Sequence, residues 1–166
     1  MDNDDQLEWR DTYFILFQSS GRPTLTQVEA AITDATKHIT LENLEADDDG
    51  MFESVLVQAP DDNAALEISF ETGEAVIEQS TALAKQLKKE LKSDQLARLL
   101  KCDARLDVML FERVGGDEAE YGGGGGKEED WEGETLDPAS MLNVVNALTK
   151  LTRGLPIDPA SGAVMT

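Results

Sequence analysis

Residues 13–17 form a run of five apolar residues, Tyr-Phe-Ile-Leu-Phe, between an acidic N-terminus and a Ser-Ser-Gly turn signal. A strand with one solvated face alternates apolar and polar residues, whereas this run does not alternate. Its short length and its aromatic and β-branched residues favour a strand over a segment of buried helix. The run therefore predicts a central strand with both faces covered.

The residues that follow predict further helices and strands. Apolar residues at three- and four-residue spacing predict a helix over residues 25–39, with Thr24 or Thr26 as its N-cap. Residues 51–59 and 65–71 flank a turn-forming segment and predict an antiparallel hairpin. In the second run Leu66, Ile68 and Phe70 alternate with Glu67, Ser69 and Glu71, so one face of that strand looks to solvent or to a polar interface.

A long helical pattern from residue 73 and a short helix from Ser93 lead into a last strand over residues 106–114. The element order is that of the ferredoxin-like split βαβ fold, an α+β arrangement in which both helices pack on one face of an antiparallel sheet. Residues 13–17 and 65–71 would be its two internal strands. A fold of this kind implies no activity.

The composition changes along the chain predict four segments. Residues 1–10 are a flexible N-terminus, although Leu7 and Trp9 alternate and would extend the first strand. Residues 11–114 are the ferredoxin-like domain, and residues 115–134 are a linker rich in glycine and acid. Residues 135–166 hold a helix that ends at Gly154 and two short strands. The apolar stripe of this helix is predicted to cover the second face of the sheet, in its own chain or by exchange in a partner subunit.

Residues 42–50 are predicted to be an acidic loop. Glu45, Asp47 and Asp49 have the spacing of the first three ligands of an EF-hand calcium loop, with Glu53 at its ninth position. The bidentate glutamate that such a loop requires is replaced by Leu56, and a strand follows. The stretch is therefore interpreted as a solvated acidic turn, and no metal ligand is assigned.

The formal net charge is −20, from 34 acidic and 14 basic residues. Such a charge argues against binding to a nucleic-acid backbone or to an anionic membrane surface, and it would attract a basic protein. A single cysteine excludes an intrachain disulfide and a thiolate zinc site. With no signal peptide and no apolar run long enough to span a membrane, a cytoplasmic location is expected.

Two residues are weighed as catalytic groups. His38 lies at the end of the first predicted helix, where a histidine more often complements the helix dipole than acts as a base. Cys102 follows a lysine, yet a small buried hydrophobic residue is the commoner role for a lone cysteine. No nucleophile-elbow motif is present, so no catalytic residue and no cofactor is assigned.

These features favour a non-catalytic intracellular protein that recognises another protein, of the immunity, inhibitor or regulatory type, with its acidic surface facing a basic partner. The first alternative is an enzyme or small-ligand module with carboxylates such as Glu67 and Glu71 between the sheet and the C-terminal segment. The second is a salt-adapted structural protein. A homodimer through the second face of the sheet is also left open.

Overall fold

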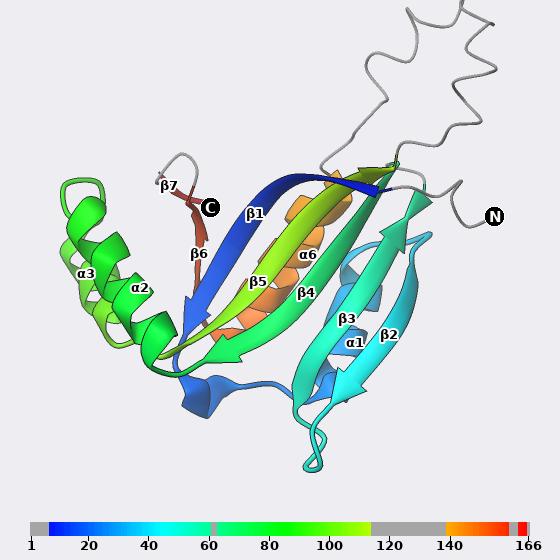
Figure 1. Ribbon diagram of the computed structural model, residues 1–166, viewed down its shortest axis with the longest axis horizontal. Coiled ribbons are helices and arrows are strands. Elements are labelled where there is room, and N and C mark those ends of the chain that lie inside the picture. Colours follow the sequence, from blue (N-terminus) through cyan, green and yellow to red (C-terminus); the bar gives the residue numbers. More distant parts are fainter. Residues whose placement is uncertain (1–6, 61–62, 114–138, 160–162, 166) are drawn as a thin grey trace, which may run out of the picture.

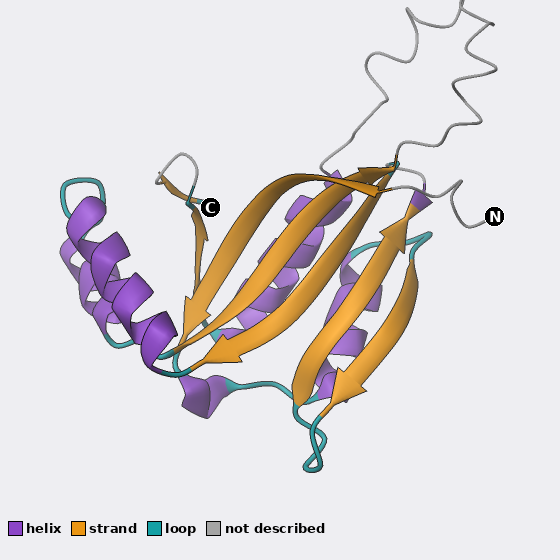
Figure 2. Cartoon of the chain, in the orientation of Figure 1, coloured by secondary structure: helices purple, strands orange, loops and turns teal. Residues whose placement is uncertain are grey.

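The computed structural model describes residues 7–60, 63–113, 139–159 and 163–165. These residues form an α+β structure with four α-helices and seven strands (Figures 1 and 2). The elements in chain order are β1 (Leu7–Phe17), α1 (Leu25–Ala35), β2 (Thr40–Ala46), β3 (Phe52–Ala59), β4 (Ala64–Thr72), α2 (Glu74–Gln86), α3 (Ser93–Leu100), β5 (Ala104–Arg113), α6 (Ala139–Thr152), β6 (Leu155–Asp158) and β7 (Ala163–Val164).

The strands form one sheet in the order β2-β3-β4-β5-β1-β6-β7, and every pair of neighbours is antiparallel. β1 includes residues 7–10, as the alternation of Leu7 and Trp9 allowed. It lies between β5 and β6, so the apolar run in its second half is an internal strand with both faces covered. Ile15 and Phe17 are buried on one face, and Leu16 is buried on the other.

The strand order is not that of a ferredoxin-like sheet. The two strands expected to be its internal pair, β1 and β4, are both internal, but β5 lies between them. The reason is that two helices connect β4 to β5. A single crossover helix returns the chain to a strand parallel to the one it left, whereas α2 and α3 run out and back, so β5 pairs antiparallel with β4 directly.

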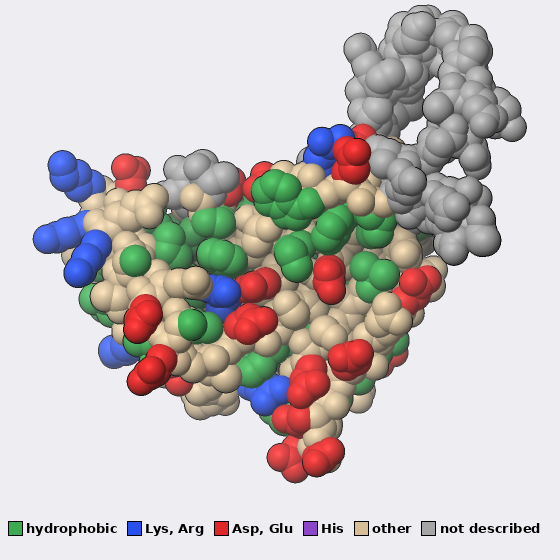
Figure 3. All heavy atoms as spheres, viewed as in Figure 1, with side chains coloured by type: hydrophobic (Ala, Val, Ile, Leu, Met, Phe, Trp, Pro, Cys, Tyr) green, Lys and Arg blue, Asp and Glu red, His purple; other side chains and the backbone are tan. Residues whose placement is uncertain are grey.

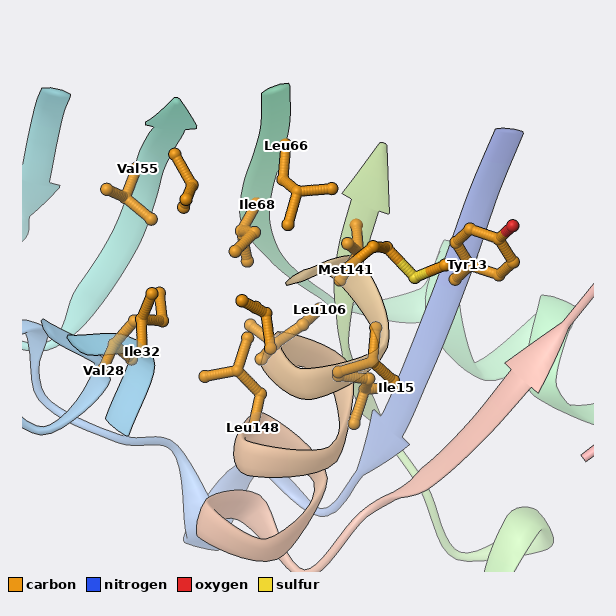
Figure 4. Close-up of a cluster of buried hydrophobic side chains, with 14 of the residues drawn as sticks. Tyr13, Ile15, Val28, Ile32, Val55, Leu66, Ile68, Leu106, Met141 and Leu148 are labelled. Atoms are coloured by element: carbon orange, nitrogen blue, oxygen red, sulfur yellow. The ribbon is translucent and has the colours of Figure 1, made fainter. Parts of the chain in front are cut away.

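Helices α1 and α6 pack side by side on one face of the sheet and form the main core with it (Figure 4). Ile32 of α1 and Leu148 of α6 both point toward the strands and are completely buried. The expectation that the helix of residues 137–153 covers the second face is therefore wrong, because α6 shares a face with α1. Its apolar stripe is buried as expected: Met141, Val144, Val145 and Leu148.

Helices α2 and α3 form a helical hairpin beside the β1–β6 side of the sheet (Figure 1). They share a second apolar cluster with Leu16 of β1 and with Leu155 and Ile157 of β6. These side chains belong to the face opposite α1 and α6, since none of them contributes to the main core. The hairpin therefore covers the second face at this end only.

The N-terminus of α1 follows one of the two predicted caps. The Oγ1 of Thr24 accepts a hydrogen bond from the backbone N–H of Gln27 at 3.1 Å, and the Gln27 side chain accepts one from the backbone N–H of Thr24 at 2.9 Å. This reciprocal pair satisfies two of the backbone donors that a helix leaves free at its start. The helix begins at Leu25, so Thr26 lies inside its first turn.

Strand β2 replaces most of the loop expected over residues 42–50. Its pairing with β3 is interrupted after Glu42, and Asn43 has a φ of 53°. A bulge of this kind disrupts the period of two by which a strand is recognised in a sequence, and asparagine tolerates the left-handed conformation better than most residues do. Residues 47–50 alone form the connecting turn.

Helix α6 ends through Arg153, which has a φ of 59°, and not through Gly154 as expected. The backbone N–H of Gly154 donates to the carbonyl of Thr149 at 3.0 Å, which closes the last turn. Gly154 serves a different purpose, because a Cβ at this position would lie 2.8 Å from the backbone oxygen of Leu16. Its missing side chain lets the chain pass directly against β1.

No helix in the described part of the chain is long and apolar enough to cross a membrane. The linker predicted over residues 115–134 lies outside the described residues, as do residues 1–6 of the predicted N-terminal segment.

Candidate functional site

We call the face of the sheet turned away from α1 and α6 the open face, because the helical hairpin of α2 and α3 covers it at one end only. Directly paired residues of neighbouring strands point to the same side of a sheet, so the register identifies its members. Thr12 pairs with Met109, Met109 with Glu67, and Glu67 with Leu56. By the same rule the open face includes Trp9, Phe14, Glu45, Ser54, Leu56, Glu67, Ser69, Glu71, Arg105, Asp107, Met109 and Phe111.

The apolar side chains of the open face are not fully covered. Phe14, Leu56, Met109 and Phe111 are half-buried, and Trp9 keeps 55% of its surface exposed. The indole N–H of Trp9 donates to the Oγ1 of Thr12 at 2.8 Å, which holds the ring over the strand that carries it. Ordered, partly exposed aromatic residues of this kind are enriched where proteins bind one another.

Acidic side chains are interspersed with these apolar groups, as the space-filling view shows (Figure 3). Arg105 is the basic residue among the members named above. Its guanidinium donates to the Asp107 carboxylate and to Gln79, and it lies 4.4 Å from the centroid of the Phe14 ring. Because Arg105 and Asp107 neutralise each other, the remaining carboxylates of Glu45, Glu67 and Glu71 leave the open face acidic.

A shallow hollow of about 410 Å³ lies on the open face, and residues of β1, β2, β3, β4 and β5 line it. Its apolar lining comes from Leu7, Leu56 and Phe111, and its acidic lining comes from Glu45 and Glu67. The Oγ of Ser54 donates to the Glu45 carboxylate at 3.3 Å, which orients that group. A site that combines apolar and acidic lining is suited to a molecule that is itself both apolar and cationic.

The helical hairpin has the opposite charge. Lysines gather around its tip, where Lys88, Lys89 and Lys92 are all exposed, and Figure 3 shows basic side chains at this end of the molecule. Acidic side chains gather at the other end, over β2, β3 and the turn that connects them. The charge of the surface thus changes across the sheet, from basic at the helical hairpin to acidic at β2 and β3.

The acidic turn after β2 is organised by the chain itself. The Oδ1 of Asp47 accepts hydrogen bonds from the backbone N–H groups of Met51 at 3.0 Å and of Asp49 at 2.9 Å, and its Oδ2 lies 3.3 Å from the Arg22 guanidinium. The Met51 bond first, then the Asp49 bond and the Arg22 charge, hold the pKa of Asp47 below its usual range. Among the described residues, no three potential metal-binding side chains lie together.

His38 and Cys102, the two residues considered as catalytic groups, lie in different parts of the structure. His38 lies beyond the end of α1, is exposed, and has a φ of 61°. Cys102 is buried beneath the helical hairpin, and its thiol donates to the backbone oxygen of Arg98 at 3.2 Å. The two residues do not form a nucleophile–base pair.

We expect Cys102 to be unreactive in the folded protein. Burial raises the pKa of this thiol to about 11, although the charge of Arg98 opposes the shift. The thiolate is the reactive form, so at pH 8 a thiol-specific reagent should modify the native protein about a hundredfold more slowly than the urea-unfolded protein. Equal rates in the two states would contradict this burial.

The carboxylates proposed for a small-ligand site, Glu67 and Glu71, are both exposed on the open face. Helix α6 packs on the opposite face, so these groups do not lie between the sheet and that helix. The alternation of β4 correctly placed both carboxylates on a solvated face. The sequence did not indicate the hollow, which combines residues of five strands.

Comparison with protein-family models, with curated proteins and with solved structures gives no significant match.

Proposed function

We propose that the chain is a non-catalytic protein that recognises another protein, and that it does so through the open face. The observation that carries this proposal is the mixture of half-buried apolar side chains and unneutralised carboxylates on a sheet surface that the helical hairpin covers at one end only. Exposed apolar surface on a large ordered element is characteristic of interaction sites.

The proposed partner is a basic protein with apolar residues among its lysines and arginines. Apolar contacts would supply most of the affinity, while Glu67 and Glu71 would select the sign of the partner's charge. The net charge of −20 would also accelerate the encounter with a basic molecule at low salt. The same charge opposes the approach of nucleic acid and of anionic membranes.

The test compares two double variants with the same change in charge. Glu67→Lys with Glu71→Lys alters the open face, and Glu29→Lys with Asp34→Lys alters exposed positions on α1, on the other side of the molecule. Each immobilised variant is incubated with extract of the source cells, and retained proteins are identified by mass spectrometry. We expect the wild type and the α1 variant to retain a basic protein that the open-face variant loses, and we expect retention to fall as salt rises.

Equal loss in both variants would mean that bulk charge, and not the open face, causes retention. Retention of the same proteins by the open-face variant would contradict the proposal. Light scattering on the wild type and on the open-face variant adds a second arm. A dimer that the open-face variant abolishes would identify a second copy of the chain as the occupant of this face, in place of a basic partner.

A further inference from the structure

The hollow on the open face is lined by both acidic and apolar side chains. Glu45 on β2 and Glu67 on β4 lie on either side of β3, whose Leu56 pairs directly with Glu67. Glu45 pairs with Ser54, two residues from Leu56 along β3, so strand spacings of about 4.8 Å and a rise of about 3.4 Å per residue place the two backbones roughly 12 Å from each other. Acidic groups therefore border the hollow on two strands, with an apolar side chain between them.

The two carboxylates differ in their contacts. Glu45 receives the hydrogen bond of Ser54, whereas no hydrogen bond or ion pair engages Glu67 within the described chain. Glu67 is exposed at the strand surface, so its charge is available to an incoming group. Phe111 and Leu7 continue the lining on the β5 and β1 side with apolar surface.

The volume of the hollow limits what it can hold. About 410 Å³ lies in the lower part of the roughly 300–1,000 Å³ range of ligand sites, which is ample for one long side chain but small for a folded element. A metal ion would gain nothing from Leu7, Leu56 and Phe111. Lysine and arginine, by contrast, combine an apolar methylene stem with a cationic head.

We propose that this hollow seats one lysine or arginine side chain of the protein partner. The stem lies against Leu56 and Phe111, and the cationic head lies between the carboxylates of Glu45 and Glu67. This inference rests on the proposed function, and it identifies the anchor position within the open face. Binding of such a side chain neutralises the charge of Glu67 and covers the apolar lining in one step.

The test uses small probes in place of the unidentified partner. The amide signals of the isotope-labelled full chain are followed by NMR during titration with Nα-acetyl-lysine methylamide, with its arginine counterpart, and with the uncharged norleucine counterpart. We expect the two cationic probes to shift signals of Glu45, Leu56, Glu67 and Phe111, and the norleucine probe to shift them much less.

The matched variants are Glu67→Gln and Glu71→Gln. Both remove a single charge from the same face of the same strand, but Glu71 does not line the hollow. Glu67→Gln should raise the Kd of the cationic probes by about fivefold, near the upper end for an exposed ion pair, and Glu71→Gln by less than about twofold. Thermal unfolding of each variant verifies that the fold is retained.

Three results would overturn the inference: equal weakening by both variants, equal binding of the norleucine probe, or the absence of localised shifts. The first would leave only bulk attraction, the second would leave only an apolar hollow, and the third would leave no site. If the hollow fails in this way while the open-face variant still loses the captured protein, the proposed function stands and only the anchor is wrong. If capture fails while the probes bind the hollow, the proposed function is wrong.

Discussion

Replacing Leu148 by alanine should lower the free energy of unfolding by about 2–5 kcal/mol. Leu148 is completely buried where α6 meets both α1 and the sheet, with Ile32 and Leu106 among the side chains drawn around it (Figure 4). Truncation removes the buried methyl groups and leaves a cavity. The cavity cannot collapse, because α1, α6 and the sheet would all have to move to fill it. Urea unfolding followed by circular dichroism measures the loss.

The matched control is Leu142→Ala on the same helix. Leu142 keeps 44% of its surface exposed, so its truncation should change the free energy of unfolding by no more than about 1 kcal/mol. Similar losses for the two variants would mean that α6 does not pack on the sheet with the face described above.

Replacing Gly154 by alanine should cost about 3 kcal/mol. The added Cβ would lie 2.8 Å from the Cγ2 of Ile15 and 2.8 Å from the backbone oxygen of Leu16, and 2.9 Å from the Oγ1 of Thr152. The Leu16 backbone has little freedom to move away, because Leu16 pairs with strands on both sides of β1. The substitution must therefore displace β6 or distort the end of α6, and thermal unfolding should detect the loss.

Two other substitutions separate crowding from backbone strain. Gly50 has a φ of 81° but open space around it, so Gly50→Ala should cost only about 1–2 kcal/mol, from the left-handed backbone alone. Arg153→Gly should be neutral or slightly stabilising, because Arg153 already occupies a left-handed conformation that glycine adopts freely. An equal cost for Gly154→Ala and Gly50→Ala would contradict the close approach of Gly154 to β1.

The local elements of this fold were predictable because each depends on residues close in sequence. The unbroken apolar run identified the internal part of β1, and Thr24 with Gln27 was one of the two predicted starts of α1. The turn-forming residues between β3 and β4 predicted their hairpin, which the register confirms. The alternation along β4 also separated its buried side chains from Glu67 and Glu71 on the open face.

The arrangement of these elements was not predictable in the same way. The pairing of β1 with β5 joins residues 7–17 to residues 104–113, far apart in the sequence, and periodicity within a strand does not indicate its neighbours. Counting α2 and α3 as one crossover led to the wrong strand order. Strand β2 was missed because the bulge at Asn43 and the acidic residues beside it resemble a loop.

The position of β1 also affects the order in which the sheet can form. Both of its neighbours, β5 and β6, follow it late in the chain: Phe17 pairs with Ala104, and Leu16 pairs with Leu155. During synthesis β1 therefore remains without its partners until the ribosome has made the residues of β5 and β6. Such distant pairings slow folding, because a long loop must close before any contact is gained. Until then, the apolar run of β1 lacks the strands that cover its edges, and such a segment is prone to misassociation in the growing chain.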